Sequence, residues 1–391
     1  MIELEHLNKE QREAVLTVNG PVLILAGAGT GKTRVITYRI THLLANGVNA
    51  SNILAVTFTN KAAREMLERV AKSVPKIRDK EKNSRPLICT FHSLGSRILR
   101  HNIEKLGYKH NFVIYDESEQ LTVVKKILSE IVTRDSKPDP KLIVSIISRI
   151  KNLGNNGRHY DDPTSNLVAE RLIKKYESAL RACNAVDYDD LLLLPLKLFK
   201  EYPDTLEHYR NKFKFIMVDE YQDTNSVQFE LMRLLAEKHR NLCVVGDDDQ
   251  SIYGWRGAEI SNILKFEEFF PDAKIVKLEQ NYRSTNTILE ASNKLISHNP
   301  KRHSKKLWSS KGSGEKIKVR CFENEEVEAN GIADWLTYLN KIMQIPLDHC
   351  AVLFRTNQQS RPIETALRKE GISYHLVGGQ SFFDRREIRD V

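Results

Sequence analysis

The sequence lacks long apolar segments and clustered cysteines, and each absence excludes a class of protein. Its longest aliphatic run, LLLLPL at 191–196, is far too short to cross a bilayer. The charged N-terminus has no apolar core of the kind found in signal peptides. The five cysteines are scattered without C-x-x-C spacing, which argues against a zinc site and against a disulfide framework. We therefore predict a soluble, cytoplasmic protein.

The charge of the chain is unbalanced toward the basic side. Lysine and arginine total 60 against 51 aspartates and glutamates, and the isoelectric point is about 9.1. Two stretches, 72–85 and 301–320, are especially rich in basic residues. A basic surface favours a polyanionic partner, although such runs more often form a solvated face unless base-stacking side chains accompany them.

Short apolar segments with β propensity recur along most of the chain. The amphipathic stretches between them are typical of helices, so we predict an α/β fold with a parallel sheet covered on both faces. Between 92 and 212 the strand signal disappears, which indicates a largely helical insertion into one α/β domain. The expected strands are 21–25, 53–58, 87–90, 215–218, 242–245 and 275–278.

A second α/β region follows. We expect a helix over 285–298, then strands over 316–322 and 350–354 around a helix at 326–342. The sequence stops at Val391 without a terminating loop or cap. We therefore expect this region to be incomplete and the chain to be an N-terminal fragment of a longer protein or a truncated product.

The stretch LAGAGTGKT, residues 25–33, directly follows a predicted strand. Glycines let a backbone approach another group closely, and such a loop before a helix wraps a phosphate chain. Gly31, Lys32 and Thr33 fit the pattern G-x-x-x-x-G-K-[ST], whereas Ala26 stands at its first position. The order strand, loop, helix favours nucleotide binding over the alternative of a glycine-rich turn with an incidental lysine.

An acidic pair ends another predicted strand, in FIMVDEYQD at 215–223. Asp219 and Glu220 lie at the carboxyl end of this strand, where α/β sheets bind ligands. Because side chains alternate on an extended chain, one carboxylate can hold Mg²⁺ through its water shell while the other faces the attacking water. A solvated strand end is the alternative, and the presence of a phosphate loop favours the catalytic interpretation.

The stretch CVVGDDDQSIYGWRGA, 243–258, combines a strand, an acidic turn and aromatic side chains. Gln250 can hydrogen-bond both a phosphate oxygen and water, which suits a sensor of the γ-phosphate. Tyr253 and Trp255 beside Arg256 suit stacking on unpaired bases. The alternative, that the two rings are core aromatics, conflicts with their polar, glycine-flanked neighbours.

Two further strand ends, in 55–66 and 89–95, carry hydroxyl, amide and aromatic groups. Such groups bind backbone phosphates and stack on bases, although each segment alone is ordinary strand-end chemistry. The presence of both on one sheet with the tryptophan loop favours a DNA surface. The candidate residues are Phe58, Thr59, Asn60, Thr90, Phe91 and His92.

The segment LEQNYRS, 278–284, presents Tyr282 and Arg283 at the start of the second region. An arginine from a neighbouring domain can neutralise charge on a phosphoryl group in transfer. A tyrosine can stack on a base ring. An interdomain salt bridge is the alternative role for Arg283.

Taken in this order, the segments resemble the superfamily 1A DNA helicases, the family that contains UvrD, Rep and PcrA. The resemblance spans nearly the whole chain, and ACNAVDYDDLLLLP and GDDDQSIY are most similar to Rep. The matching segments are AGAGTGKT, TFTNKAAREM, TFHSLG, DYDDLL, VDEYQD, VGDDDQSIYGWRGA, LEQNYRS and GGQSFFDRREIRDV.

The resemblance implies an ATP-dependent DNA helicase that unwinds duplex DNA in the 3′–5′ direction during replication or repair. It implies a first RecA-like P-loop NTPase domain over 1–91 and 213–278, the helical insertion over 92–212, and the beginning of a second RecA-like domain over 279–391. Family motifs that would follow Val391, including a second arginine finger, are missing. We therefore expect this chain alone to bind DNA and to hydrolyse ATP slowly, but not to unwind duplex DNA.

The resemblance also implies roles for individual residues. The catalytic set is Lys32 on the β- and γ-phosphates, Glu220 as the base, Gln250 as the γ-phosphate sensor and Arg283 as the arginine finger. The magnesium ligands are Thr33 and Asp219. The nucleotide-binding residues also include Gln11 and Tyr282 at the adenine and the loop Ala26, Gly27, Ala28, Gly29, Thr30 and Gly31. The DNA contacts are Phe58, Tyr188, Tyr253, Trp255, Arg256 and Phe382.

The implied cofactors are ATP and Mg²⁺, and the implied partners are single-stranded DNA and junctions of single- and double-stranded DNA, with no membrane. A second copy of the chain and replication or repair proteins are the candidate protein partners. Two alternative functions stay open. One is an ATP-regulated single-strand-binding fragment without unwinding activity, and the other is the motor part of a helicase-nuclease.

Overall fold

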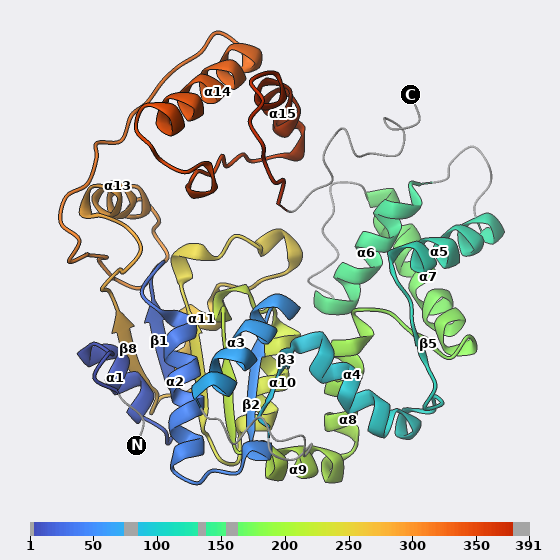
Figure 1. Cartoon of the computed structure of the whole chain (residues 1–391). Helices are drawn as coiled ribbons and strands as arrows, with labels where there is room; N and C mark the ends of the chain where they lie inside the picture. The colour runs from blue at the N-terminus through green and yellow to red at the C-terminus, as the bar shows by residue number, and fades with distance from the viewer. Residues whose placement is uncertain (1–3, 74–84, 132–137, 154–162, 378–391) are drawn as a thin grey trace. The chain divides into compact units, whose positions relative to one another are not determined.

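The chain folds into two compact units, Met1–Glu315 and Lys316–Val391, which are described separately. The computed structural model describes residues 4–73, 85–131, 138–153 and 163–377 (Figure 1). Within these ranges, no helix is both long enough and apolar enough to span a membrane.

The first unit is built on six parallel strands in the order β3-β2-β6-β7-β1-β8. The parallel α/β fold is confirmed, and each predicted strand agrees with the structure within one residue at either end. Neighbouring strands that are parallel require long crossover connections, and helices fill them. The strands are β1 (Val22–Ala26), β2 (Ile53–Thr57), β3 (Leu87–Thr90), β6 (Phe215–Val218), β7 (Leu242–Gly246) and β8 (Lys274–Leu278).

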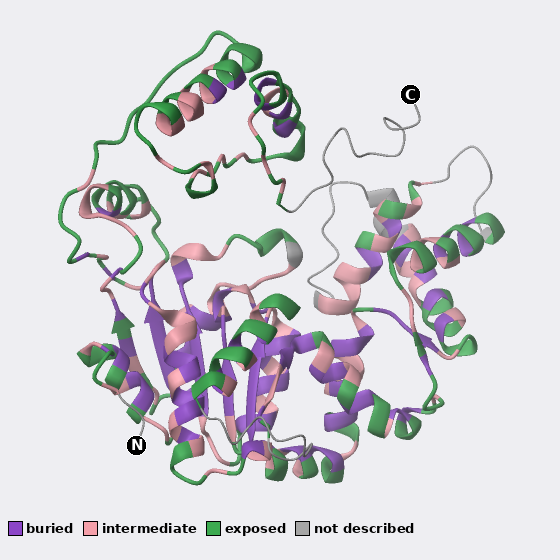
Figure 2. Ribbon diagram, in the orientation of Figure 1, coloured by how far each residue is buried: buried purple, intermediate pink, exposed green. Residues whose placement is uncertain are grey.

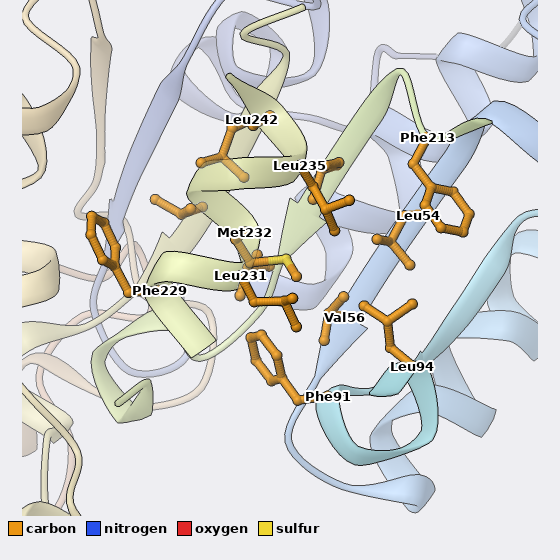
Figure 3. Close-up of a cluster of buried hydrophobic side chains, with 14 of the residues drawn as sticks. Leu54, Val56, Phe91, Leu94, Phe213, Phe229, Leu231, Met232, Leu235 and Leu242 are labelled. Carbon is orange, nitrogen blue, oxygen red and sulfur yellow. The ribbon is translucent and has the colours of Figure 1, made fainter. Parts of the chain in front are cut away.

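Both faces of this sheet are covered, as the continuous apolar strands predict. Alternate residues of β1 belong to different apolar clusters: Leu23 and Leu25 face one helical layer, while Val22 and Ile24 face the other. The strands are therefore buried along most of their length (Figure 2). One layer contains α1 (Lys9–Leu16), α2 (Lys32–Ala45) and α3 (Asn60–Ser73). The other contains α4 (Phe91–Asn102), α8 (Asp190–Glu201) and α10 (Ser226–Ala236), part of which is drawn in Figure 3.

The helical character expected between 92 and 212 is present. Three helices pack around an apolar cluster of their own that includes Ile143, Leu172 and Tyr176. They are α5 (Glu117–Ile131), α6 (Pro140–Leu153) and α7 (Pro163–Ala182), and α9 (Pro203–Lys212) follows α8. The parallel pair β4 (Val113–Ile114) and β5 (Ala185–Val186) was not predicted, because two residues are too few to form a recognisable pattern.

The rest of the first unit consists of the connection from β7 to β8 and the chain that follows β8. Two short helices, α11 (Ser261–Leu264) and α12 (Phe266–Phe269), connect β7 to β8. After β8 the chain forms α13 (Asn286–Ile296) and then returns, so that the Asn281 backbone N–H donates to the Trp308 carbonyl at 2.7 Å.

The second unit contains α14 (Glu325–Lys341) and α15 (Ser360–Lys369), which pack through small and apolar residues such as Ala333 and Leu367. The predicted helix at 326–342 is confirmed. The strands predicted at 316–322 and 350–354 are wrong: both segments are irregular. Apolar alternation indicates a strand only where another strand supplies hydrogen-bond partners, and no strand is described in this unit. Leu353 is accordingly 89% exposed.

Candidate nucleotide site and nucleic-acid surface

The strand register brings four loops to one edge of the sheet. Ala26 at the end of β1 pairs with Leu278 at the end of β8, and Leu25 pairs with Gly246 at the end of β7. Val218 of β6 lies beside Val244 of β7. The segments after β1, β6, β7 and β8 therefore start side by side, in the position where parallel sheets bind ligands.

The loop after β1 has the conformation of a phosphate-binding loop. Gly29 and Gly31 adopt left-handed backbone angles with φ of 69° and 91°, which side chains disfavour. Helix α2 then begins at Lys32, and its first-turn N–H groups have no intrahelical acceptor. A loop of this shape directed at free N–H groups and a positive helix end is suited to a phosphate chain.

Lys32 and Glu220 meet beside this loop. The Lys32 ammonium lies 3.0 Å from a Glu220 carboxylate oxygen, an ion pair by distance. The contact lacks hydrogen-bond alignment, so the buried ammonium makes no hydrogen bond to the protein. Glu220 itself has φ of 50°, a left-handed conformation that costs a non-glycine residue about 1–2 kcal/mol. The fold thus holds an unsatisfied cation and a strained carboxylate where a phosphate would lie.

Asp219 is buried at the end of β6, next to Glu220. The Thr33 hydroxyl donates to an Asp219 carboxylate oxygen at 3.4 Å. Burial and the Glu220 charge raise the pKa of Asp219 to about 6, against the opposing effect of Lys32. A buried carboxylate that is destabilised as an anion is one that a bound cation would stabilise. Oxygen donors of this kind suit Mg²⁺.

Gln250 joins the site through residues that the sequence did not single out. Its side-chain amide donates to Asp247, whose backbone N–H donates to the Gln222 side chain at 3.0 Å. Gln222 in turn donates to Glu220 at 3.0 Å. Gln222 lies within the quoted VDEYQD segment, but its position in that segment gave no sign of this contact. The predicted base and the predicted γ-phosphate sensor thus belong to one hydrogen-bonded chain.

The two adenine candidates, Gln11 and Tyr282, are linked only indirectly, through Gln280 and Asn8. Gln280 accepts from the Tyr282 hydroxyl at 3.0 Å and from the Asn8 side chain at 3.1 Å, and Asn8 caps the helix that carries Gln11. Gln11 is completely buried and donates to the Thr30 carbonyl at 2.8 Å. Its amide retains a second N–H and a second lone pair. The adenine assignment stays a prediction.

Asn281, which the sequence also left unassigned, holds the phosphate loop. Its side chain donates to the Ala28 carbonyl at 2.6 Å, and the next backbone N–H, that of Tyr282, donates to the Gly29 carbonyl at 2.9 Å. Arg283 therefore follows directly over the loop, with an exposed side chain. Its role as an arginine finger stays a prediction.

Some of the predicted DNA-contacting residues are exposed in the structure, and others are buried. Trp255 and Tyr188 are 73% and 52% exposed, respectively, and Tyr253 is exposed as well. Thr59 and Asn60 are exposed beyond β2, where Phe58 is half-buried. The His92 ring is edge-on to that of Tyr188 at 6.2 Å between centroids, and burial lowers the pKa of His92. The side chain of Arg256 and all of Phe382 lie outside the described residues.

Two of the DNA candidates serve the fold instead. Phe91 is only 2% exposed and belongs with Leu94 to the apolar cluster drawn in Figure 3. Its ring also lies edge-on to that of Phe58, which packs against the cluster. Thr90 is buried, and its hydroxyl oxygen accepts from the Ser93 backbone N–H as the N-cap of α4. In this arrangement neither side chain presents a surface to DNA, because the Phe91 ring and the Thr90 hydroxyl are both buried in the fold.

Two family models match the chain in succession. Residues 7–271 match the UvrD/REP helicase N-terminal domain, and residues 276–391 match the UvrD-like helicase C-terminal domain. The chain belongs to the UvrD/REP helicase family. The resemblance inferred from the motifs is therefore confirmed at the level of the family.

Individual relatives agree with this assignment. The ATP-dependent DNA helicase PcrA of Bacillus subtilis strain 168 is 46% identical over 397 residues, which cover 99% of this chain and 52% of that protein. PcrA of Leuconostoc citreum is 45% identical over 98% of this chain and 51% of its own length. PcrA of Staphylococcus aureus strain Mu50 is 45% identical, with coverage of 99% and 53%. The chain thus spans about half the length of these relatives, which are named PcrA rather than Rep.

Proposed function

We propose that the chain is an ATP-hydrolysing motor that binds single-stranded DNA and acts in 3′–5′ unwinding during replication or repair. The observation that carries the proposal is the buried Lys32 ammonium, which lacks a hydrogen-bond partner in the protein and lies 3.0 Å from Glu220 behind a phosphate loop. A catalytic carboxylate beside an unsatisfied cation suits cleavage of a phosphate chain. The names of the relatives, all ATP-dependent DNA helicases, support the same function.

Each residue of the proposed site has a chemical task. Lys32 would hold the β- and γ-phosphates, and the Glu220 carboxylate would take a proton from the water that attacks the γ-phosphorus. Gln250 would sense the γ-phosphate through its amide, and Arg283 would neutralise charge on the phosphoryl group in transfer. Tyr282 would stack on the adenine. The hydrogen-bonded chain from Glu220 to Gln250 supports the concerted placement of base and sensor.

Thr33 and Asp219 would hold Mg²⁺. When bound, the ion supplies positive charge to the phosphates. In its absence, Asp219 is a buried carboxylate whose pKa is raised to about 6, first by burial and then by Glu220. The hydroxyl and the carboxylate lie 3.4 Å apart, and both are the hard oxygen donors that this ion prefers.

We propose the following assignment of residues to domains. Residues 1–91 and 213–278 would form the first RecA-like ATP-binding domain, 92–212 its helical insertion, and 279–391 the beginning of a second motor domain. The six-stranded sheet supports the first assignment and the helical cluster of α5, α6 and α7 supports the second. The exposed rings of Tyr188, Tyr253 and Trp255 would stack on unpaired bases.

The test compares nucleotide binding with ATP hydrolysis in three variants. Lys32→Ala should weaken both, because it removes the cation at the phosphates. Glu220→Gln should keep nucleotide binding while hydrolysis falls by about 10²–10⁴, the usual contribution of a general base. The matched control is Asp223→Asn, a nearby carboxylate whose pKa burial also raises to about 6. Hydrolysis near the wild-type rate in Glu220→Gln, or a large loss confined to Asp223→Asn, would exclude Glu220 as the base.

A further inference from the structure

A buried lysine lies among three consecutive aspartates in the turn after β7. The Lys305 ammonium is 2.8 Å from Asp247 and 2.7 Å from Asp249, and it also contacts Asp248. Its side chain is 2% exposed. Arg302 donates to both carboxylate oxygens of Asp249, at 2.8 Å and 2.7 Å. Residues more than fifty positions apart in the sequence thus form one compact ionic cluster.

Three clustered carboxylates resemble a metal site, but here the ammonium of Lys305 lies among them. One carboxylate oxygen from each of Asp247, Asp248 and Asp249 lies within 4.8 Å of the other two. The Lys305 ammonium already contacts all three, so a cation of the protein itself neutralises them. Burial alone would lower the pKa of Lys305, but the three aspartates outweigh it and raise the pKa, so the ammonium stays charged.

Asp247 connects this cluster to the proposed ATP site. One of its carboxylate oxygens accepts from Lys305, and the other accepts from the side-chain amide of Gln250. Its backbone N–H donates to Gln222, which donates to Glu220. The direction in which the Gln250 amide points therefore depends on a carboxylate that Lys305 and the Asp249 backbone N–H hold together, through the same oxygen.

We propose that Lys305 is a positioning residue for Gln250: it holds Asp247 and the turn Asp248–Gln250 so that the Gln250 amide is oriented before nucleotide arrives. The inference deepens the proposed function, because it takes Gln250 as the γ-phosphate sensor. In this proposal, the basic segment around 301–306 serves to hold the aspartate turn within the protein. Lys305 is thereby unavailable to DNA, unlike its exposed neighbour Lys306.

The first test measures the turn itself and needs no catalysis. Two hydrogen bonds close this turn: the Gln250 N–H donates to the Asp247 carbonyl at 2.9 Å, and the Asp249 N–H donates to the Asp247 carboxylate at 3.2 Å. In Lys305→Met, amide hydrogen exchange in peptides covering the turn should accelerate by about tenfold or more, while peptides of β1 keep their rates. The matched control Lys306→Met, which removes the same charge from an exposed position, should leave the turn unchanged. Equal exchange in wild type and Lys305→Met would overturn the proposal.

The second test is kinetic and separates positioning from folding. Lys305→Met should lower kcat for ATP by about tenfold, with nucleotide affinity within about threefold of the wild type. Gln250→Ala should have its own loss in the wild-type background but add less than about threefold in Lys305→Met, because the amide is already misplaced. Losses that multiply would refute the dependence of Gln250 on Lys305. A wild-type chain without ATPase activity would refute the proposed function instead, and the exchange test would still decide the role of Lys305.

The loss of a buried cation can prevent folding, so a second variant is paired with the first. Lys305→Met combined with Asp248→Asn removes one of the carboxylate charges that Lys305 neutralises in the wild type, and it retains Asp247, which contacts Gln250. The double variant should fold and show the same rapid exchange and low kcat. Wild-type exchange and kcat in it, or failure of both variants to fold, would mean that Lys305 serves only the fold and would refute the positioning role.

Discussion

Gly29 is the position in the phosphate loop where one methyl group gives the sharpest test of the site. Its φ is 69°, and a Cβ built there would lie 2.7 Å from the Asn281 side-chain nitrogen and 2.8 Å from the Arg283 Cβ. Asn281 is buried and held by its bond to the Ala28 carbonyl, and the Arg283 Cβ moves only with its backbone. The substitution Gly29→Ala must therefore push 281–283 away from the loop.

The loss of folding stability expected for Gly29→Ala has two parts, which can be measured separately. A left-handed alanine costs about 1–2 kcal/mol. Overpacking against a held neighbour typically adds about 1–3 kcal/mol. Gly20 supplies the control, because its φ is 77° and nothing lies within 4 Å of the position of a Cβ. Gly20→Ala should therefore lower the free energy of unfolding by the first part alone, and Gly29→Ala by about 2–5 kcal/mol in total.

The assay is urea unfolding of both variants, followed by titration with a fluorescent ATP analogue. Gly29→Ala should also weaken nucleotide binding, because the loop and Tyr282 lose their shared hydrogen bond, whereas Gly20→Ala should bind normally. Equal losses of stability in the two variants would refute the packing of 281–283 on the loop. Unchanged nucleotide binding in Gly29→Ala would separate that packing from the site.

The remaining predictions concern DNA and pH. Trp255→Ala should weaken single-strand binding by about 1–3 kcal/mol with little sequence preference, and fluorescence anisotropy in a variant shown to be folded checks this; unchanged affinity would assign Trp255 a structural role. Burial lowers the pKa of His239, whose Nε2 has no hydrogen-bond partner, so the unfolded chain takes up a proton first as the pH falls. Between about pH 8 and pH 5 the wild type should therefore lose more stability in urea than His239→Gln, and parallel losses would contradict this.

The sheet and the nucleotide loop were predictable because each depends on local sequence. Short apolar runs between amphipathic stretches, such as FIMV at 215–218, have few other stable arrangements than a buried parallel strand. Once the strands are parallel, Lys32 and Asp219 must lie at the same edge, because each follows a carboxyl end. The proximity of Lys32 to Glu220 thus follows from topology alone, although their distance of 3.0 Å does not.

The contacts of the 301–306 segment with the three aspartates after β7 were not predictable. The basic run at 301–320 was expected as a solvated or DNA-facing surface, and nothing local distinguishes Lys305 from Lys306. Only the path of the chain after α13 brings Lys305 to Asp247. The burial of Phe91 was unpredictable for a related reason. An aromatic residue at a strand end can point to solvent or to the core, and its direction depends on the helices that pack behind the sheet.

Three features of the proposed ATP site oppose the stability of the folded chain. Glu220 is held at a positive φ, the Lys32 ammonium is buried without a hydrogen bond, and the pKa of Asp219 is raised. Each is unfavourable in the protein alone, and neighbouring side chains relieve them only in part: Lys32 pairs with Glu220 by distance, and Lys32 and Thr33 oppose the raised pKa of Asp219 without cancelling the rise. A ligand that brings phosphate oxygens to the ammonium and a cation to the carboxylate would relieve the last two together. Because such a ligand binds only the folded chain, its binding energy adds to the free energy of unfolding. The strain at this edge of the sheet is therefore evidence that the fold is arranged around an anionic ligand and its counterion.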